Sequence, residues 1–227
     1  ASQMGLEDLA LFRSLPGSTV LYPSDAVAAQ KLVQQAALRE GITYIRTTRP
    51  ATAVIYPATE DFPIGDFKVV REGERDVVVL IGAGVTLHEA LKAHVLLNKE
   101  RVSSAVVDLY SIKPLHAGNL TEFVRDHGSR VVVVEDHYGE GGMGDAVAHA
   151  LEGSGILIHR LAVQKTPHSG TKEQLLAASG IDANAIMHAS LKLVRPTEPE
   201  RAEKVMRERK TRVKKVVKKK KRSSRLK

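Results

Sequence analysis

The chain has 227 residues and carries 34 Lys and Arg against 26 Asp and Glu, a formal net charge of +8. With 43% hydrophobic residues, it is long enough and apolar enough to bury a core. It contains no cysteine, which excludes a disulfide framework, a thiolate zinc site and a cysteine nucleophile. No apolar run approaches the roughly 20 residues that cross a bilayer, so we expect a soluble intracellular protein with no membrane partner.

The positive charge is concentrated at the C-terminal end of the sequence. Residues 195–227 hold 16 Lys and Arg against 4 Asp and Glu, which leaves 18 basic and 22 acidic residues for the first 194. Residues 218–222 are five consecutive basic residues. The folded part is therefore expected to be weakly acidic, and any binding to nucleic acid or another polyanion would involve the tail alone.

The N-terminal part predicts one parallel strand–helix–strand unit. Residues 19–23 resemble a short buried strand, Asp25 is placed to cap a helix that runs to residue 38, and residues 42–46 alternate as a second strand. A helix is also predicted before residue 19, from the apolar residues Met4, Leu6, Leu9, Leu11 and Phe12. Its apolar side chains need a sheet to pack against, and the sequence supplies too few strands on that side. We therefore expect Ala1 to be an internal position of a longer protein.

Residues 47–66 are polar and contain three prolines, which predicts a linker between two domains. A second α/β series follows, with strands expected at residues 76–81, 105–110, 131–135 and 156–161, and helices at 86–99, 117–127, 144–151, 171–178 and 182–193. This alternation predicts an open, mostly parallel sheet covered by helices on both faces. We therefore divide the chain into a first domain portion (1–46), a linker (47–66), an α/β domain (67–194) and a disordered basic tail (195–227).

Two glycine-rich turns are candidate ligand sites. The turn at Gly82–Gly84 resembles the start of a dinucleotide fingerprint, but the third glycine is missing, which favours a structural turn. The turn at residues 139–144 would suit an anion through its backbone donors. Its acidic surroundings, which include Glu135 and Asp145, favour a turn that needs positive φ instead.

Histidine and arginine supply the other candidates. The spacings of the nine histidines do not predict a metal site. His137 ends a predicted strand, where ligands gather in open sheets, although an imidazole tied to a neighbouring carboxylate is the favoured interpretation. Arg46 also ends a predicted strand, with Arg49 close behind. A guanidinium there suits a phosphate, whereas a plain surface arginine is the alternative.

Five separated motifs resemble the C-terminal portion of transketolase, in the order of that family. The first consists of residues 1–16 (ASQMGLEDLALFRSLP) followed by 22–25 (YPSD). The others are residues 44–48 (YIRTT), 81–90 (IGAGVTLHEA), 112–115 (IKPL) and 134–144 (VEDHYGEGGMG). The resemblance runs from Ala1 to about Val194. It implies the second half of the family's pyrimidine-binding domain, followed by the transketolase C-terminal domain.

The resemblance also implies an activity. Members of the family move a two-carbon ketol unit between ketose and aldose phosphates with thiamine diphosphate and Mg²⁺ (or Ca²⁺), as homodimers. Position by position, Gln3 corresponds to a residue that binds the cofactor, and Arg46 to an arginine that holds the substrate phosphate. The C-terminal domain is expected to carry no catalytic residue and to serve packing and dimerisation. A cytoplasmic location is expected, and the tail composition is compatible with nuclear import.

Two departures from the family limit this prediction. The chain lacks the stretch that carries the family's catalytic glutamate and active-site histidines, and it lacks the domain that binds the diphosphate and the metal. We therefore expect it to be inactive alone, as a fragment or as the complement of another polypeptide. The tail has no family counterpart. The alternative function is a non-catalytic α/β binding module whose basic tail contacts nucleic acid or another polyanion.

Deletion of residues 195–227 should leave the melting temperature of the remaining chain nearly unchanged. The apolar residues between 201 and 222 are too sparse to pack on the body, and like charges repel at helical i, i+4 spacing. The same deletion should abolish retention on heparin at low salt, because binding to polyanions rests on the tail charge. Melting curves and heparin chromatography test both expectations. A fall of many degrees on truncation would contradict them.

Overall fold

Two sheets organise the chain in the computed structural model, which describes residues 5–49 and 51–195. Gln3 and the predicted disorder of the basic tail lie outside the described residues. Contacts separate Ala1–Val194 from Arg195–Lys227, and the description below concerns the first of these units. Within the described residues, no helix combines the length and hydropathy needed to span a membrane.

The smaller sheet has the strand order β2-β1-β6. Strands β1 (Thr19–Leu21) and β2 (Thr43–Ile45) are parallel, and helix α2 (Ala26–Ala36) connects them. Asp25 caps α2 through a side-chain bond from the Ala28 amide at 2.8 Å, which confirms the predicted cap. Helix α1 (Asp8–Ser14) precedes β1 and packs against it.

The larger sheet has the order β3-β5-β4-β7-β8. Four of its strands are parallel, as predicted: β4 (Val79–Gly82), β5 (Ala105–Asp108), β7 (Arg130–Tyr138) and β8 (Leu157–Val163). The helices of this part are α3 (Val85–Lys99), α4 (Ala117–Asp126), α5 (Met143–Ala150), α6 (Lys172–Ala178) and α7 (Ala183–Val194).

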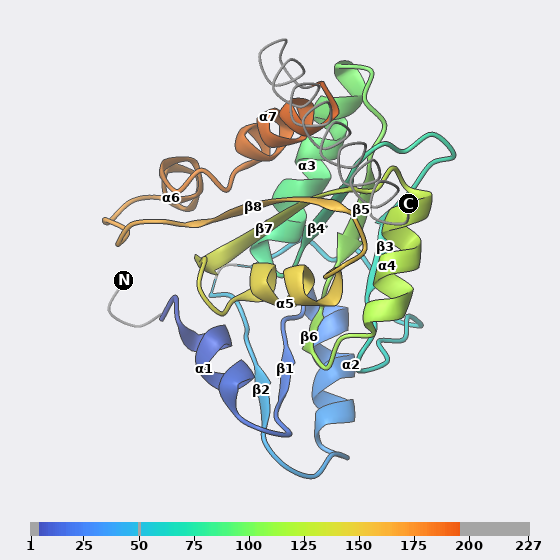
Figure 1. Ribbon diagram of the computed structural model, residues 1–227. Coiled ribbons are helices and arrows are strands. Elements are labelled where there is room, and N and C mark those ends of the chain that lie inside the picture. The colour runs from blue at the N-terminus through green and yellow to red at the C-terminus, as the bar shows by residue number, and fades with distance from the viewer. Residues whose placement is uncertain (1–4, 50, 196–227) are drawn as a thin grey trace, which may run out of the picture. The chain divides into compact units, whose positions relative to one another are not determined.

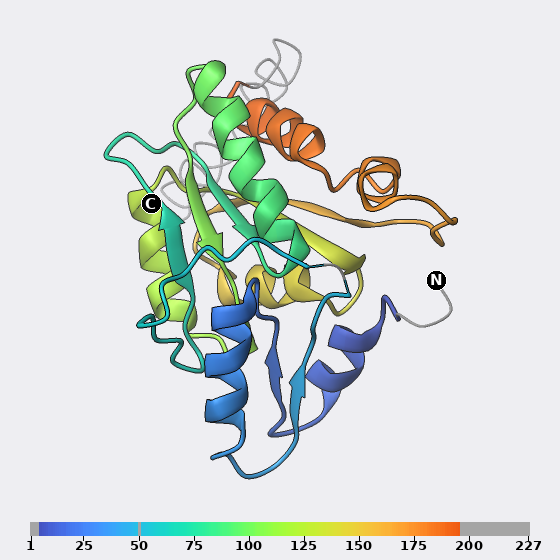
Figure 2. The same cartoon turned by 180° about the vertical axis from the view of Figure 1, so that it is seen from behind.

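Helices cover both faces of the larger sheet. Figure 1 shows α4 and α5 on one side, and Figure 2 shows α3 and α7 on the other. The alternation of strand residues explains this arrangement. Val131 and Val133 of β7 pack into one apolar cluster with α4 and α5, whereas Val132 and Val134 pack into a second with α3 and α7. The expected open α/β sheet with two covered faces is thus confirmed.

Two strands were not predicted, and both are antiparallel. Strand β3 (Lys68–Arg71) lies at the edge of the larger sheet, where its partly exposed residues show little apolar alternation. Strand β6 (Ser111–Lys113) begins three residues after the end of β5, so the sequence pattern indicates a single strand there. Strand β6 pairs with β1 rather than with the larger sheet, so the C-terminal part of the chain completes the N-terminal sheet.

Residues 47–49 and 51–66 form no helix or strand, but part of this segment is tightly held. Asp25 Oδ2 accepts hydrogen bonds from the amides of Ile55 and Tyr56, at 2.8 and 3.0 Å. The fully buried Phe62 contacts the rings of Tyr56 and Tyr110 edge to face, with centroids 4.9 and 5.1 Å away. The segment therefore contributes to a third apolar cluster, which joins α2 to the larger sheet.

Gly84 permits the Tyr22 ring to pack closely against the turn after β4. It precedes α3 with φ of 55°, and a Cβ atom at this position would overlap the Tyr22 ring that follows β1. Gly84→Ala should therefore lower the free energy of unfolding by about 2–4 kcal/mol, through overpacking and a strained φ. Urea denaturation measures this change.

Gly118 of α4 provides the matched control. A Cβ atom there would meet no atom within 4 Å, and the residue lies inside a helix. Gly118→Ala should leave stability unchanged or raise it by up to about 1 kcal/mol. Equal free energies of unfolding for the two variants would show that the approach of Tyr22 to Gly84 does not limit packing.

Candidate functional site

Arg46 lies where three elements meet. It directly follows β2, and its side chain is 11% exposed. Its Nε lies 3.2 Å from Asp8 Oδ2 on α1. Its Nη1 and Nη2 donate to Asp136 of β7, to Oδ1 at 3.2 Å and to the backbone oxygen at 3.0 Å. The guanidinium therefore joins the N-terminal sheet to the larger one.

Two tyrosines complete this arrangement. The Tyr22 hydroxyl donates to Asp136 Oδ2 at 2.9 Å, and the Tyr44 hydroxyl donates to Asp8 Oδ2 at 2.6 Å. The Arg46 guanidinium carbon lies 4.9 Å from the centroid of the Tyr22 ring, within cation–π range. Each carboxylate thus contacts the guanidinium and accepts one hydroxyl. These residues (Asp8, Tyr22, Tyr44, Arg46 and Asp136) are called the Arg46 cluster below.

The electrostatics of the cluster keep Arg46 charged and both tyrosines protonated. Burial alone would lower the pKa of Arg46, but Asp136 and the other neighbouring acidic groups outweigh burial and raise it. Burial, and then the charge of Asp136, raises the pKa of Tyr22. Burial and the bond to Asp8 raise the pKa of Tyr44 to about 12. At neutral pH, the cluster is therefore a fixed set of N–H and O–H donors around two carboxylates.

A cavity of about 310 Å³ opens beside the cluster. Arg49 brings a second positive charge to its wall, so two arginines face two aspartates there. Asp8 Oδ1 is buried without a hydrogen-bond partner among the described residues. The cavity is lined by Gly5, Asp8, Tyr22, Tyr44, Ile45, Arg46, Thr47, Thr48, Arg49, Val85 and Asp136. Arginine N–H groups suit a phosphate group. A phosphate here would bind through those N–H groups of Arg46 that do not contact Asp8 or Asp136.

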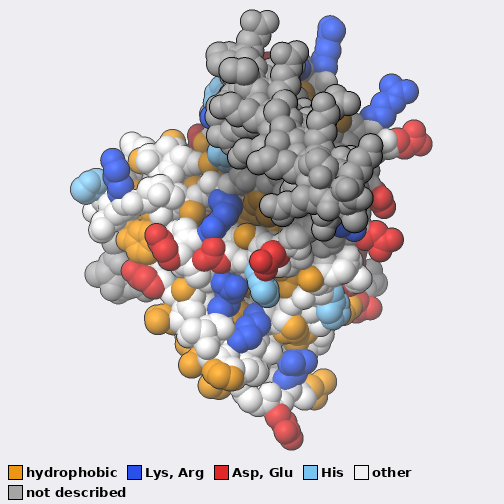
Figure 3. Space-filling view, viewed as in Figure 1, with side chains coloured by type: hydrophobic (Ala, Val, Ile, Leu, Met, Phe, Trp, Pro, Cys, Tyr) orange, Lys and Arg blue, Asp and Glu red, His pale blue; other side chains and the backbone are white. Residues whose placement is uncertain are grey.

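The described surface carries charges of both signs on the face that Figure 3 shows. In Figure 3, basic and acidic side chains lie intermingled on the face shown, without forming a large patch of one sign. This mixture is consistent with the near balance of 18 basic and 22 acidic residues before residue 195. Recognition of an anion in the described part of the chain therefore depends on local geometry rather than on a broad positive field.

His137 is a structural residue in this fold. Its side chain is fully buried. Nδ1 lies 2.5 Å from the Tyr138 carbonyl oxygen, and Nε2 lies 3.3 Å from the Ala10 amide. These contacts fix the tautomer, because Nδ1 must donate to the carbonyl while Nε2 accepts from the amide. The expected bond to a neighbouring carboxylate is thus replaced by backbone bonds, one of which holds α1.

The two glycine-rich turns are filled by protein side chains. The Tyr22 ring packs against Gly84 in the first turn. In the second turn, a Cβ atom at Gly142 would overlap the Glu135 carboxylate, and Arg13 and Arg160 donate to backbone oxygens of the turn. Burial raises the pKa of Glu135 to about 7. The favoured interpretation of both segments as structural turns is consistent with this packing.

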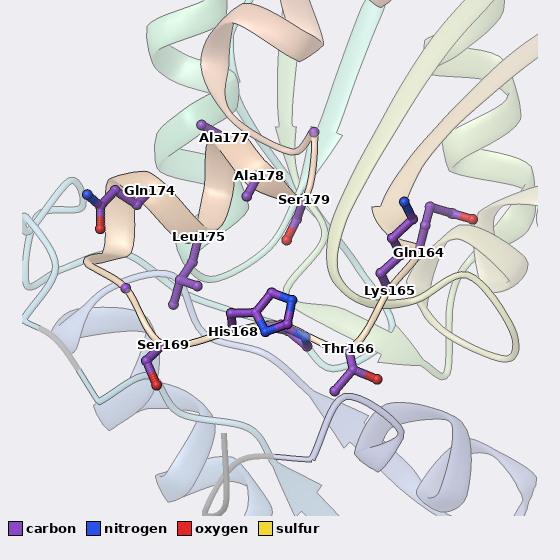
Figure 4. Close-up of a pocket in the computed structure, with 13 residues that line it drawn as sticks. Gln164, Lys165, Thr166, His168, Ser169, Gln174, Leu175, Ala177, Ala178 and Ser179 are labelled. Carbon is purple, nitrogen blue, oxygen red and sulfur yellow. The ribbon is translucent and has the colours of Figure 1, made fainter.

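A second cavity, of about 480 Å³, lies between the loop after β8 and helix α6. Figure 4 shows the residues that line it, most of them on that loop and on α6. Lys165 and His168 are the ionisable residues in its wall. Among the described residues, no group of three or more His, Cys, Asp or Glu side chains could hold a metal ion. The Arg46 cavity therefore remains the better candidate for chemistry.

Comparison with known proteins identifies the family. The transketolase pyrimidine-binding domain matches residues 1–54, and the transketolase C-terminal domain matches residues 65–186. The chain belongs to the transketolase family. Human transketolase is 51% identical over 189 residues, which cover 83% of this chain and 30% of the human protein. Mouse transketolase is 50% identical over 194 residues, which cover 85% of this chain and 31% of the mouse protein.

A solved structure agrees with this assignment. It is described as a split-gene transketolase, an inactive beta4 tetramer, and it matches with a TM-score of 0.77 and 33% sequence identity. The match covers 84% of this chain and 62% of that chain. The transketolase-family chain described here thus spans about 30% of the length of the curated relatives that it matches.

The family's pyrimidine-binding domain implies the use of thiamine diphosphate. The described residues of this transketolase chain do not form a complete site for that cofactor. Gln3 lies outside them, and they offer no cluster for the cation that would accompany a diphosphate. What they offer is the Arg46 cavity and the unpartnered oxygen of Asp8.

Sequence reasoning selected Arg46 as a candidate but missed the residues that contact it. Tyr22, Tyr44 and Asp136 all lie within motifs that resemble transketolase. No spacing rule brings them together, because Tyr22 follows β1 whereas Tyr44 and Asp136 lie on β2 and β7. In the sequence, Asp8 is an ordinary acidic residue in the first turn of a helix. Only the folded structure shows that Asp8 and Asp136 contact the same guanidinium.

A second buried carboxylate joins the same two parts of the transketolase chain. Asp108, which is fully buried, accepts hydrogen bonds from the Ser24 and Tyr56 hydroxyls, both at 2.7 Å. Ser24 Oγ in turn accepts from the Gly84 amide at 2.8 Å. Burial raises the pKa of Asp108 to about 7, although the two hydroxyls act in the opposite direction.

The raised pKa of Asp108 makes stability depend on pH. In the unfolded chain the pKa of an aspartate is about 3.9. Between about pH 4 and 7, Asp108 is therefore protonated to a greater extent in the folded chain than in the unfolded chain. The free energy of unfolding contributed by this group therefore falls as pH rises through that range. Asp108→Asn should reduce the loss of stability between pH 5 and 7.5 by on the order of 2 kcal/mol, as measured by urea denaturation.

Asp61→Asn is the control for this prediction, because the Asp61 side chain is 87% exposed. This variant should keep the pH dependence of the wild type. Glu135, with a raised pKa of its own, should preserve part of the slope in both variants. An unchanged slope in Asp108→Asn would show that Asp108 is ionised in the folded chain throughout this range.

Proposed function

We propose that this chain is the portion of a transketolase that supplies the second half of the pyrimidine-binding domain and the C-terminal domain. The complete enzyme transfers a two-carbon ketol unit between ketose and aldose phosphates. Thiamine diphosphate, when bound, supplies the means to stabilise negative charge on that unit. The proposal is supported by the two family matches and by 51% identity to human transketolase.

The observation that carries the role of this chain is the placement of Arg46. Its guanidinium is held charged at the carboxyl end of a strand, beside a cavity that also contains Arg49 and two threonines. A substrate phosphate bound there would leave the sugar carbons free to reach the rest of the active site. The task of these residues is to bind and orient the substrate.

Other parts of the proposal concern the assembly. The catalytic acid–base groups and the site for the diphosphate, with Mg²⁺ or Ca²⁺, would come from segments beyond this sequence or from another polypeptide. The similar split-gene transketolase is described as inactive in its beta4 form. We propose that this chain, too, acts only when completed, as part of a homodimeric cytoplasmic enzyme.

A chimera tests the proposal directly. The chain segment that matches human transketolase would replace its counterpart in the human enzyme. The chimera should transfer two-carbon units, and Arg46→Ala should raise its KM for phosphorylated donors by about 10- to 1000-fold, because a charge-assisted hydrogen bond is lost. Turnover of an unphosphorylated ketose donor should change little. Steady-state kinetics with both donors measures the difference.

Arg39→Ala serves as the control, since Arg39 is exposed and lies beyond the end of α2. It should leave the KM of both donors unchanged. An equal loss on the two donors in Arg46→Ala would assign Arg46 to folding or cofactor placement. A folded chimera without any transfer activity would contradict the proposed function as a whole.

A further inference from the structure

The C-terminal domain contributes directly to the site of Arg46, beyond packing and dimerisation. We propose that Asp136 of β7 is a positioning residue, which orients the Arg46 guanidinium for the phosphate group of the substrate. This inference rests on the proposed function, because it assigns a phosphate ligand to Arg46. The evidence is the geometry of Asp136, the rigidity of its strand and the balance of charge in the cavity.

Asp136 holds Arg46 through two separate acceptors. Its Oδ1 accepts from Nη1 at 3.2 Å and its backbone oxygen accepts from Nη2 at 3.0 Å, so one residue fixes both terminal nitrogens. Its remaining oxygen, Oδ2, accepts from the Tyr22 hydroxyl, and the Tyr22 ring lies under the guanidinium. Neither the carboxylate nor the guanidinium can rotate without losing a hydrogen bond.

The strand around Asp136 is itself rigid. Its neighbours Glu135 and His137 are 2% and 0% exposed. Glu135 Oε1 accepts from the Gly144 amide at 3.1 Å, and His137 contacts backbone groups on both sides. Strand β7 pairs with β8 on both sides of Asp136, at Val134 and again at Tyr138, with a register shift between these two pairs. Asp136 therefore stands on a fixed support, which is the condition for orienting another side chain.

Orientation and charge act in opposite directions at this site. The carboxylate of Asp136 repels a phosphate, yet it also prevents the long Arg46 side chain from adopting other rotamers. A free arginine side chain has many rotamers, so a guanidinium that is already held in place loses less conformational entropy on binding. Nη1 and Nη2 each donate one hydrogen bond to Asp136, and Nε lies 3.2 Å from Asp8 Oδ2. Each terminal nitrogen carries a second N–H group, and these two groups would meet the phosphate.

Two substitutions at Asp136 separate these effects. Asp136→Asn keeps a side-chain oxygen and the backbone oxygen as acceptors, but it removes the negative charge. Asp136→Ala removes the side-chain acceptor together with the charge. If Asp136 acts by orientation, only the alanine variant should weaken phosphate binding. If it acts mainly by repulsion, both variants should strengthen binding.

The experiment titrates inorganic phosphate into the chain while NMR follows the Arg46 Nε–Hε resonance. In the wild type, phosphate should shift this resonance in a saturable manner. Asp136→Ala should raise the dissociation constant at least fivefold, whereas Asp136→Asn should stay within twofold of the wild type or bind more tightly. Tyr22→Phe removes only the hydroxyl that holds Asp136 Oδ2. It should weaken binding two- to threefold, and it replaces the alanine variant if that variant does not fold.

The outcomes distinguish this inference from the proposed function. If Arg46 does not respond to phosphate in the wild type, the phosphate role of Arg46 is overturned, and the inference falls with it. If the wild type responds and Asp136→Ala binds phosphate as well as the wild type or better, only the inference is overturned. A loss in Asp136→Asn equal to that in Asp136→Ala would also overturn it, because orientation would then not be the cause.

Discussion

The Arg46 guanidinium is the interaction on which the arrangement of the two sheets depends. It is almost buried, it contacts a carboxylate from α1 and another from β7, and it lies over the Tyr22 ring. A buried cation is tolerated only where acceptors surround it. The acceptors that Arg46 requires come from α1 and from β7, so its burial depends on these two elements meeting beside β2. The cavity lies where they meet.

Other contacts between the same parts are also polar, and each has a backbone group or a buried acid at its centre. Asp108 accepts from Ser24, and Ser24 accepts from Gly84. His137 accepts from Ala10, so α1 is held by a side chain of the larger sheet. Such bonds specify one relative placement, because each buried donor or acceptor loses its partner if the parts slide. Apolar packing alone is non-directional, so it specifies the relative placement of the two parts less strictly.

Much of this fold was predictable from the sequence, because its buried parallel strands are apolar runs that alternate with helical segments. The Asp25 cap and the residues of β5 illustrate this, since each signal is local. Strand β6 was not predictable, because its partner lies 90 residues earlier in the chain. Arg46 could be selected as a candidate from its place after a predicted strand. Asp8 and Asp136 could not, since only the folded arrangement of α1 and β7 brings their carboxylates to one guanidinium.

The cost of the Arg46 cluster argues for a role beyond stability. Removing a guanidinium and two carboxylates from water carries a desolvation penalty that their attraction often fails to exceed, and apolar replacements are frequently as stable. The described chain already has apolar clusters on both faces of its larger sheet. What the charged cluster adds is direction: it holds the Arg46 guanidinium in one orientation beside the cavity. A guanidinium held in one orientation beside a cavity is what distinguishes a surface that can bind an anion from a folded scaffold.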